Sequence, residues 1–146
     1  MKTGARDLRP GLSIRKHALQ LASVLLRRFA FEVNRTAKPG DPEAIHDLRV
    51  SIRRLTHCLR LFERFFPRGE AKEIRRDLKA LMTQAAQIRN RDVAIDLLHR
   101  AGIRTASAIL ASMEQEREHG RRQLVESLKR WSHRGSFKKW RSRLDL

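Results

Sequence analysis

Residues Ile45 to Phe66, IHDLRVSIRRLTHCLRLFERFF, carry the clearest structural signal in the chain. At the helical spacing of about 100° per residue, their apolar and basic side chains separate onto opposite faces. The apolar face must be buried against neighbouring helices, and it consists of Leu48, Ile52, Leu55, Leu59, Phe62 and Phe66. We therefore predict a long amphipathic helix over residues 42–66, packed within an all-α fold.

The opposite face of this helix is basic. It consists of His46, Arg49, Arg53, His57, Arg60 and Arg64, which we call the basic stripe. With a rise of about 1.5 Å per residue, the stripe is about 27 Å long. Like charges one helical turn apart repel one another, and no acidic residue lies within the stripe to neutralise them. The pattern therefore predicts a binding site for an extended polyanion.

Local signals also place a helix before the basic one. Ser13 is expected to cap this first helix, and Lys38-Pro39-Gly40 is expected to end it, because proline and glycine interrupt helices. Asp41 then caps the basic helix, and Pro42 occupies its first position, where the missing amide hydrogen costs nothing. The inward residues of the first helix recur at helical spacing, and they are Ala18, Leu21, Leu25, Phe29 and Val33.

Three more helical segments follow the basic helix. A third helix carries apolar residues from Ala71 to Ile88 at alternating steps of three and four, and it is expected to continue to a stop at Ala101-Gly102. A fourth carries its inward residues from Ala106 to Trp131, and a short closing helix covers residues 137–144. Long helices joined by short connections favour an antiparallel four-helix bundle, here with a short C-terminal helix.

Composition limits the class of protein. The chain of 146 residues is long enough for one domain with its own core, so we expect a single domain over residues 1–146 with residues 1–11 as a frayed lead-in. Lys and Arg number 33 against 16 Asp and Glu, and this net charge of +17 predicts an anionic partner. A single cysteine, Cys58, fits a reducing compartment. With no membrane-spanning or signal segment evident, we expect a cytoplasmic protein without membrane partners.

The basic helix resembles the signature helix of the CHAD family, the histidine-containing α-helical domains. The residues that carry the resemblance are His46-Asp47-Leu48-Arg49-Val50, Arg53-Arg54 and Leu61-Phe62, preceded by the lead-in Asp41-Pro42-Glu43-Ala44. Downstream, the segment from Ile88 to Val93, IRNRDV, resembles the family's Arg-Asp segment but lacks the glycine often found just before it. The resemblance covers about residues 12–130, nearly the whole chain.

The resemblance implies that the protein binds inorganic polyphosphate in a basic groove between helices, with association with polyphosphate granules as one purpose. Carried over by position, the ligand-facing residues are His46, Arg49, Arg53, Arg54 and Arg60, while His57 and Arg64 are added from the helical wheel alone. The family's usual form has two related four-helix lobes, and this chain matches a short, single-lobe version. A two-fold homodimer would supply the missing lobe, so we expect a homodimer.

The third helix offers a secondary basic surface. Lys72, Arg76 and Lys79 lie away from its apolar seam, where they extend the basic surface or form an ordinary solvated face. Arg91, which belongs to the same secondary surface, is expected to form a structural ion pair with its neighbour Asp92 rather than to contact phosphate directly.

Other functions are less well supported. Nonspecific binding of DNA or RNA is the main alternative, because +17 attracts any polyanion, but the basic stripe has no interleaved aromatic residues to stack bases. A di-iron site would use Glu43 with His46 and Glu116 with His119, but the additional inward glutamates that it needs are not evident. Neither a glycine-rich phosphate loop nor an activated nucleophile is present. We therefore predict a binding protein without catalytic residues, metal or other cofactor.

Overall fold

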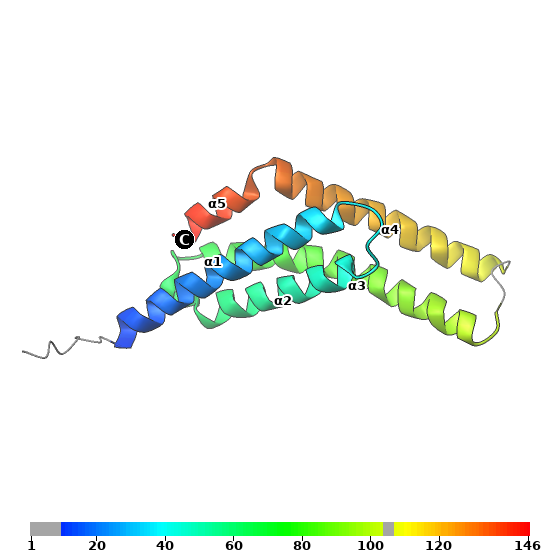
Figure 1. The fold of residues 1–146 in the computed structure, drawn as a ribbon, viewed down its shortest axis with the longest axis horizontal. Coiled ribbons are helices and arrows are strands. Elements are labelled where there is room, and N and C mark those ends of the chain that lie inside the picture. The colour runs from blue at the N-terminus through cyan, green and yellow to red at the C-terminus, as the bar shows by residue number, and fades with distance from the viewer. Residues whose placement is uncertain (1–9, 104–106) are drawn as a thin grey trace, which may run out of the picture.

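A computed structural model describes residues 10–103 and 107–146, and in these residues the chain is helical with no strand. Four long helices and one short helix are joined by short connections (Figure 1). Their bounds are α1 Pro10–Thr36, α2 Ala44–Leu61, the 3-10 helix η1 Glu63–Phe65, α3 Glu70–Arg100, α4 Ala108–His133 and α5 Ser136–Arg143.

The four long helices form an antiparallel bundle. α1 packs against α2 and α4, α3 packs against α2 and α4, and α5 folds back onto α1 and α4 (Figure 1). The expected all-α four-helix bundle with a short C-terminal helix is therefore confirmed.

The core forms because each helix has one apolar face. Leu48, Ile52, Leu55 and Leu59 of α2 are buried, as their spacing predicts. Where α5 packs on α1, the ring centroid of Phe29 lies 5.8 Å from that of Trp140, and the two rings are stacked. Because the apolar face of α2 is buried in the core, the residues on its opposite face must face solvent.

The start of α1 differs from the prediction. α1 begins at Pro10, so the prediction that Ser13 caps this helix is wrong. Proline is well suited to a first helical position because its fixed φ is already helical. Pro10 and Gly11 belong to α1 and not to the expected lead-in, whose residues 1–9 lie outside the described part of the chain.

α2 is shorter than the expected span of residues 42–66. Asp41 does not cap it: the N-cap residue is Glu43, and the Asp41 carboxylate accepts a hydrogen bond from the Glu43 amide at 3.0 Å. At its other end α2 stops at Leu61, and Phe66 is extended with ψ of 159°. Pro67 explains this geometry, because a residue that precedes proline is disfavoured in the helical region. Phe66 still returns to the core.

α3 and α4 are longer than the bundle that they complete. α3 has 31 residues and α2 only 18, so the C-terminal part of α3 and the N-terminal part of α4 extend beyond α2 (Figure 1). We call this extension, residues 89–103 and 107–120, the arm. Ser107 caps α4 by accepting a hydrogen bond from the Leu110 amide at 3.2 Å. Ala106, predicted to be an inward residue of this helix, lies outside the described residues.

Candidate functional site

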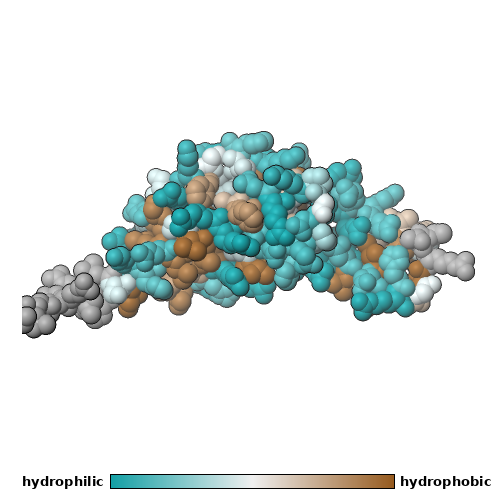
Figure 2. All heavy atoms as spheres, viewed as in Figure 1, coloured by the Kyte–Doolittle hydropathy of each residue, from teal (hydrophilic) through white to brown (hydrophobic). Residues whose placement is uncertain are grey.

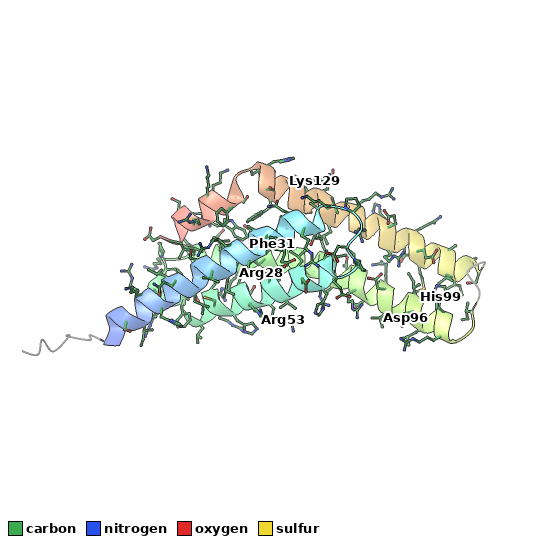
Figure 3. The ribbon with its side chains drawn as sticks, in the orientation of Figure 1. Arg28, Phe31, Arg53, Asp96, His99 and Lys129 are labelled. Atoms are coloured by element: carbon green, nitrogen blue, oxygen red, sulfur yellow. The ribbon has the colours of Figure 1, made fainter. Side chains whose placement is uncertain are left out.

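The outer surface of α2 presents the basic residues singled out from the sequence. Because the apolar residues of α2 point into the core, the side chains of Arg53, His57 and Arg60 are exposed, and that of Arg49 is half-buried. Arg53 extends from the outer side of α2 in Figure 3. We call the basic residues on the outer side of α2 the α2 basic face, and they are His46, Arg49, Arg53, Arg54, His57 and Arg60.

A groove between α2 and α3 runs along one side of this face. It has a volume of about 420 Å³, and Arg53, His57 and Arg60 line it from α2. From α3 it receives Arg75 and Lys79. Lys79, which was predicted to belong to the secondary basic surface, therefore lies beside the α2 basic face. Arg75, which the sequence did not single out, lies there as well.

A second groove, between α1 and α2, lies on the other side of the face. Its two parts have volumes of about 670 and 530 Å³, and Arg54 lines both of them. His46 and Arg28 line the second part, and Figure 3 shows Arg28 on α1 beside Phe31, with its guanidinium 5.2 Å from the Phe31 ring centre. Arg54 therefore faces α1 and Arg60 faces α3, whereas Arg53 and His57 line both grooves. The basic face is a ridge with a groove on each side.

The floor of the α1–α2 groove is apolar. Leu21, Leu25 and Val50 line it, and hydrophobic residues are visible on the surface over α1 and α2 (Figure 2). Cys58 also lies in this groove, where burial raises the pKa of its thiol to about 11. The thiol is therefore protonated at neutral pH and is a poor nucleophile.

The arginines of the α2 basic face are not neutralised by carboxylates. Among the residues that the structure describes, no Asp or Glu oxygen lies within 4.0 Å of the guanidinium of Arg49, Arg53, Arg54 or Arg60. The Nε of Arg49 is buried without a hydrogen-bond partner in this part of the chain. These arginines are consequently available to an anion from outside the chain.

One pair of side chains organises the face internally. A guanidinium nitrogen of Arg60 lies 3.2 Å from Nδ1 of His57. Since arginine has only donors, Arg60 is the donor and Nδ1 of His57 the acceptor in this contact. His57 therefore orients Arg60 along the groove.

Asp47 is the acidic residue nearest in sequence to His46, and it is occupied elsewhere. Arg35 of α1 donates hydrogen bonds to Asp47 at 2.6 Å and to Asp41 at 2.7 Å. The two carboxylates hold the pKa of Arg35 well above its usual range, and Arg35 lowers the pKa of Asp41. Arg35 thereby ties the start of α2 to α1 and keeps Asp47 away from the basic face.

Three predicted members of the site have other surroundings. Arg64 lies in η1 rather than on α2, because α2 ends at Leu61, and its guanidinium lies over the ring of Phe65 at 4.7 Å. Arg64 therefore does not extend the line of cations on α2. On α3, Lys72 and Arg76 are exposed, and Arg76 lies 3.7 Å from Glu73.

The expected ion pair between Arg91 and Asp92 is wrong. Arg91 pairs with Glu116 at 3.1 Å, and Asp92 pairs with Arg117 at 3.4 Å. Adjacent residues on a helix point about 100° apart, so each of them reaches across to α4 instead. The two pairs connect the helices of the arm.

Clusters of metal-ligating side chains and membrane-spanning helices are both absent from the described residues. Within residues 10–103 and 107–146, no group of three or more His, Cys, Asp and Glu side chains is arranged to hold a metal ion. Glu116, which a di-iron site would require, is paired with Arg91. In the same two ranges, every helix is too short or too polar to cross a lipid bilayer.

The fold and the surface define a class of protein: an antiparallel helical bundle with one basic helix, whose exposed arginines have no carboxylate partner among the described residues. A family model for the CHAD domain matches residues 20–145, nearly the whole chain, and the chain therefore belongs to the CHAD family. The resemblance seen in the basic helix is thus confirmed, and the match extends through α5. No curated protein and no solved structure matches the chain significantly.

Proposed function

We propose that this CHAD domain binds inorganic polyphosphate along the α2 basic face, as a binding module without catalytic activity. The observation that carries the proposal is the row of arginines on α2, which have no carboxylate partner among the described residues and are flanked by two grooves. CHAD domains are associated with polyphosphate binding and are generally not catalytic, which supports the choice of ligand.

The chemistry of the residues suits a linear phosphate polymer. A guanidinium can donate two hydrogen bonds to the oxygens of one phosphate and remains charged at any physiological pH. Arg49, Arg53 and Arg60 are spaced by one or two helical turns, so they present cations at intervals of about 5 to 11 Å along one edge of α2. In this mechanism the three arginines bind phosphates along one strand, while Arg54 binds from the α1 side.

The histidines and the α3 residues complete the proposed site. His57 orients Arg60, and His46, which lines the α1–α2 groove, donates a hydrogen bond to phosphate from a ring nitrogen. Lys79 and Arg75 contribute charge from the far wall of the α2–α3 groove. Arg75 is shared with Glu63, which lies 3.0 Å away, so Lys79 is the stronger candidate for phosphate contact.

Replacing Arg49, Arg53 and Arg60 by alanine tests this proposal. Each phosphate contact with a single-stranded polyanion contributes about 0.7 to the slope of log affinity against log salt. We expect the triple variant to lose most of its affinity and about 2 units of this slope, measured by fluorescence anisotropy of labelled polyphosphate.

The matched control replaces Arg27, Arg89 and Arg100, which are exposed and lie outside the α2 basic face. It removes the same net charge and should retain most of the affinity. Equal losses in the two triple variants would show that net charge, not the α2 basic face, binds the ligand, and this result would favour the alternative function of nonspecific nucleic-acid binding.

We also propose that the protein is a homodimer that acts in the cytoplasm, at polyphosphate granules. One observation supports a second copy as the partner of the arm. The face of α3 that packs on α2 continues beyond the start of α2 with Val93 and Leu97, whose exposed fractions are 44% and 59%. Exposed apolar side chains one turn apart on a helix favour a protein contact.

A further inference from the structure

The second concentration of positive charge lies at the C-terminal end of the chain. Between Glu126 and Asp145 the sequence contains no acidic residue. The cations in this interval that face solvent form what we call the α4–α5 cluster, and they are Lys129, Arg130, Arg134, Lys138, Lys139 and Arg141. The α2 basic face therefore accounts for only part of the net charge of +17.

The members of the α4–α5 cluster lack acidic partners. All six are exposed, and in the part of the chain that the structure describes no carboxylate lies within 4.0 Å of any of them. Arg143, by contrast, is half-buried and forms an ion pair with Glu70. Arg130 donates only to the hydroxyl of Ser127, at 3.3 Å. The cluster thus resembles the α2 basic face in having cations without neutralisation.

The stability of the helices explains only some of these positions. Arg130 in the last turn of α4 is favoured by the negative end of the helix dipole. Lys138 and Lys139 lie in or next to the first turn of α5, which contains no acidic residue, and there the positive end of the dipole disfavours a cation. Arg130 and Arg134, one turn apart, also repel each other. An external anion would remove both costs.

The cluster and the α2 basic face point away from each other. α5 packs on α1 and α4, whereas α2 packs on α1 and α3. Figure 3 shows Lys129 on the outer edge of α4 and Arg53 on the outer edge of α2, with the bundle between them. One straight segment of a polyanion cannot lie on both surfaces, so each surface is available to a different strand.

We propose that the α4–α5 cluster is a second binding surface for inorganic polyphosphate, so that one protein molecule bridges two strands. This inference rests on the proposed function for its choice of ligand. Polyphosphate suits the cluster better than nucleic acid does, because Trp140 is buried and Phe137 and Trp131 are half-buried in the bundle. No ring in the cluster is therefore free to stack on bases. Bridging would gather polyphosphate strands into a condensed assembly.

The test measures energy transfer between two populations of long-chain polyphosphate, one labelled at its ends with a donor and the other with an acceptor. Wild-type protein should bring the two populations together and produce energy transfer. In the background of Val93→Glu and Leu97→Glu, where no dimer can present two α2 basic faces, the cluster variant R130Q/R134Q/K138Q/K139Q should bind single strands through α2 but lose the transfer. A control with the same loss of charge, R15Q/K16Q/R27Q/R89Q, should retain it.

Combining surfaces separates this inference from the proposed function. With Arg49, Arg53 and Arg60 replaced by Ala, residual single-strand binding that disappears when the cluster substitutions are added would support the second surface. If the α2 substitutions leave single-strand affinity unchanged and the cluster substitutions abolish it, the α2 proposal fails and the cluster stands.

Three results would overturn the second surface. One is full energy transfer by the cluster variant in the background of Val93→Glu and Leu97→Glu, where a dimer cannot account for the transfer. Another is the absence of energy transfer with wild-type protein. The third is displacement of polyphosphate from the cluster by an equal phosphate concentration of double-stranded DNA, which would mean that the cluster is not selective for polyphosphate. Circular dichroism of each variant verifies that its helices are intact.

Discussion

Arg35 is the residue that fixes where the basic helix begins. It donates to Asp41 before α2 and to Asp47 in the first turn of α2, and it lies 3.2 Å from Glu32, whose side chain is buried in the bundle. This arrangement explains how the α2 basic face stays free of acidic partners although Asp47 lies next to His46 in sequence. Asp47, the acidic residue closest in sequence to the α2 basic face, is already hydrogen-bonded to Arg35 of α1.

The Arg35 interaction predicts an acid dependence of stability. The usual pKa of an aspartate is 3.8, and in the folded protein that of Asp41 is lower because Arg35 bonds to the carboxylate. A depressed pKa contributes stability that is present above about pH 4 and is lost as the pH falls through the folded value. Asp41→Asn should therefore lower the melting temperature at pH 7 and flatten its decrease between about pH 5 and pH 3.

Thermal melts followed by circular dichroism would measure this difference. Asp145→Asn is a suitable control, because Asp145 is exposed near the C-terminus. A wild-type protein and an Asp41→Asn variant with parallel pH profiles would contradict the role assigned to the Arg35–Asp41 bond.

The helices show which parts of the fold follow from local sequence and which require tertiary contacts. Leu48, Ile52, Leu55 and Leu59 were correctly assigned to the core because helical periodicity places them on one face. The end of α2 was wrong because the apolar pattern continues through Phe62 and Phe66, while the backbone turns at η1 to meet Pro67. Periodicity records which side chains are buried and not whether the backbone between them is helical.

In the candidate site, too, some features follow from local sequence and others depend on tertiary contacts. The exposure of Arg53, Arg54 and Arg60 could be predicted from a single helix. Arg75 and Arg28 could not, because each joins the site only through the way its helix packs against α2. The partners of Arg91 and Asp92 were missed for the same reason, since Glu116 and Arg117 lie about 25 residues away in sequence and are brought close by the α3–α4 hairpin.

The arm is expected to be the least stable element of the bundle. It has two helices, whereas the body has four, and its ion pairs are exposed enough to contribute only about 0.2–1 kcal/mol each. Leu110 is fully buried within it. Leu110→Ala should cost about 2–4 kcal/mol and increase amide exchange in residues 89–103 and 107–120 while α1 and α2 remain protected.

Hydrogen exchange read by mass spectrometry would check this prediction. Ile109→Ala serves as the control, because the neighbouring Ile109 side chain is 69% exposed and its loss should change exchange little. Equal acceleration of exchange in all helices of the Leu110→Ala variant would show that the arm and the body unfold as one unit.

For the whole molecule, oligomeric state is the property that the arm predicts. Val93→Glu with Leu97→Glu would place two carboxylates on the uncovered face of α3. If a second copy covers this face, the double variant should elute as a monomer and the wild-type protein as a dimer in size-exclusion chromatography with light scattering. The control is Leu61→Glu, which changes an apolar side chain that is 75% exposed on α2. A wild-type protein that is monomeric both with and without polyphosphate would refute the homodimer.

The charge of the whole molecule makes selectivity the decisive question for its function. A domain with a net charge of +17 will attract DNA and RNA as well as polyphosphate, because counterion release does not depend on the bases. What distinguishes the ligands is the shape and spacing of their phosphates. The α2 basic face offers arginines along one straight helix edge, between two grooves, which suits a thin, flexible strand better than a double helix.

Competition for immobilised long-chain polyphosphate separates these ligands. The bound protein is challenged at physiological salt with equal phosphate concentrations of long-chain polyphosphate, short oligophosphate, double-stranded DNA and RNA. We predict that only long-chain polyphosphate displaces the protein efficiently, and that the Arg49, Arg53 and Arg60 triple variant is barely retained at the start. Equal displacement by DNA or RNA would contradict this account and identify a general polyanion binder.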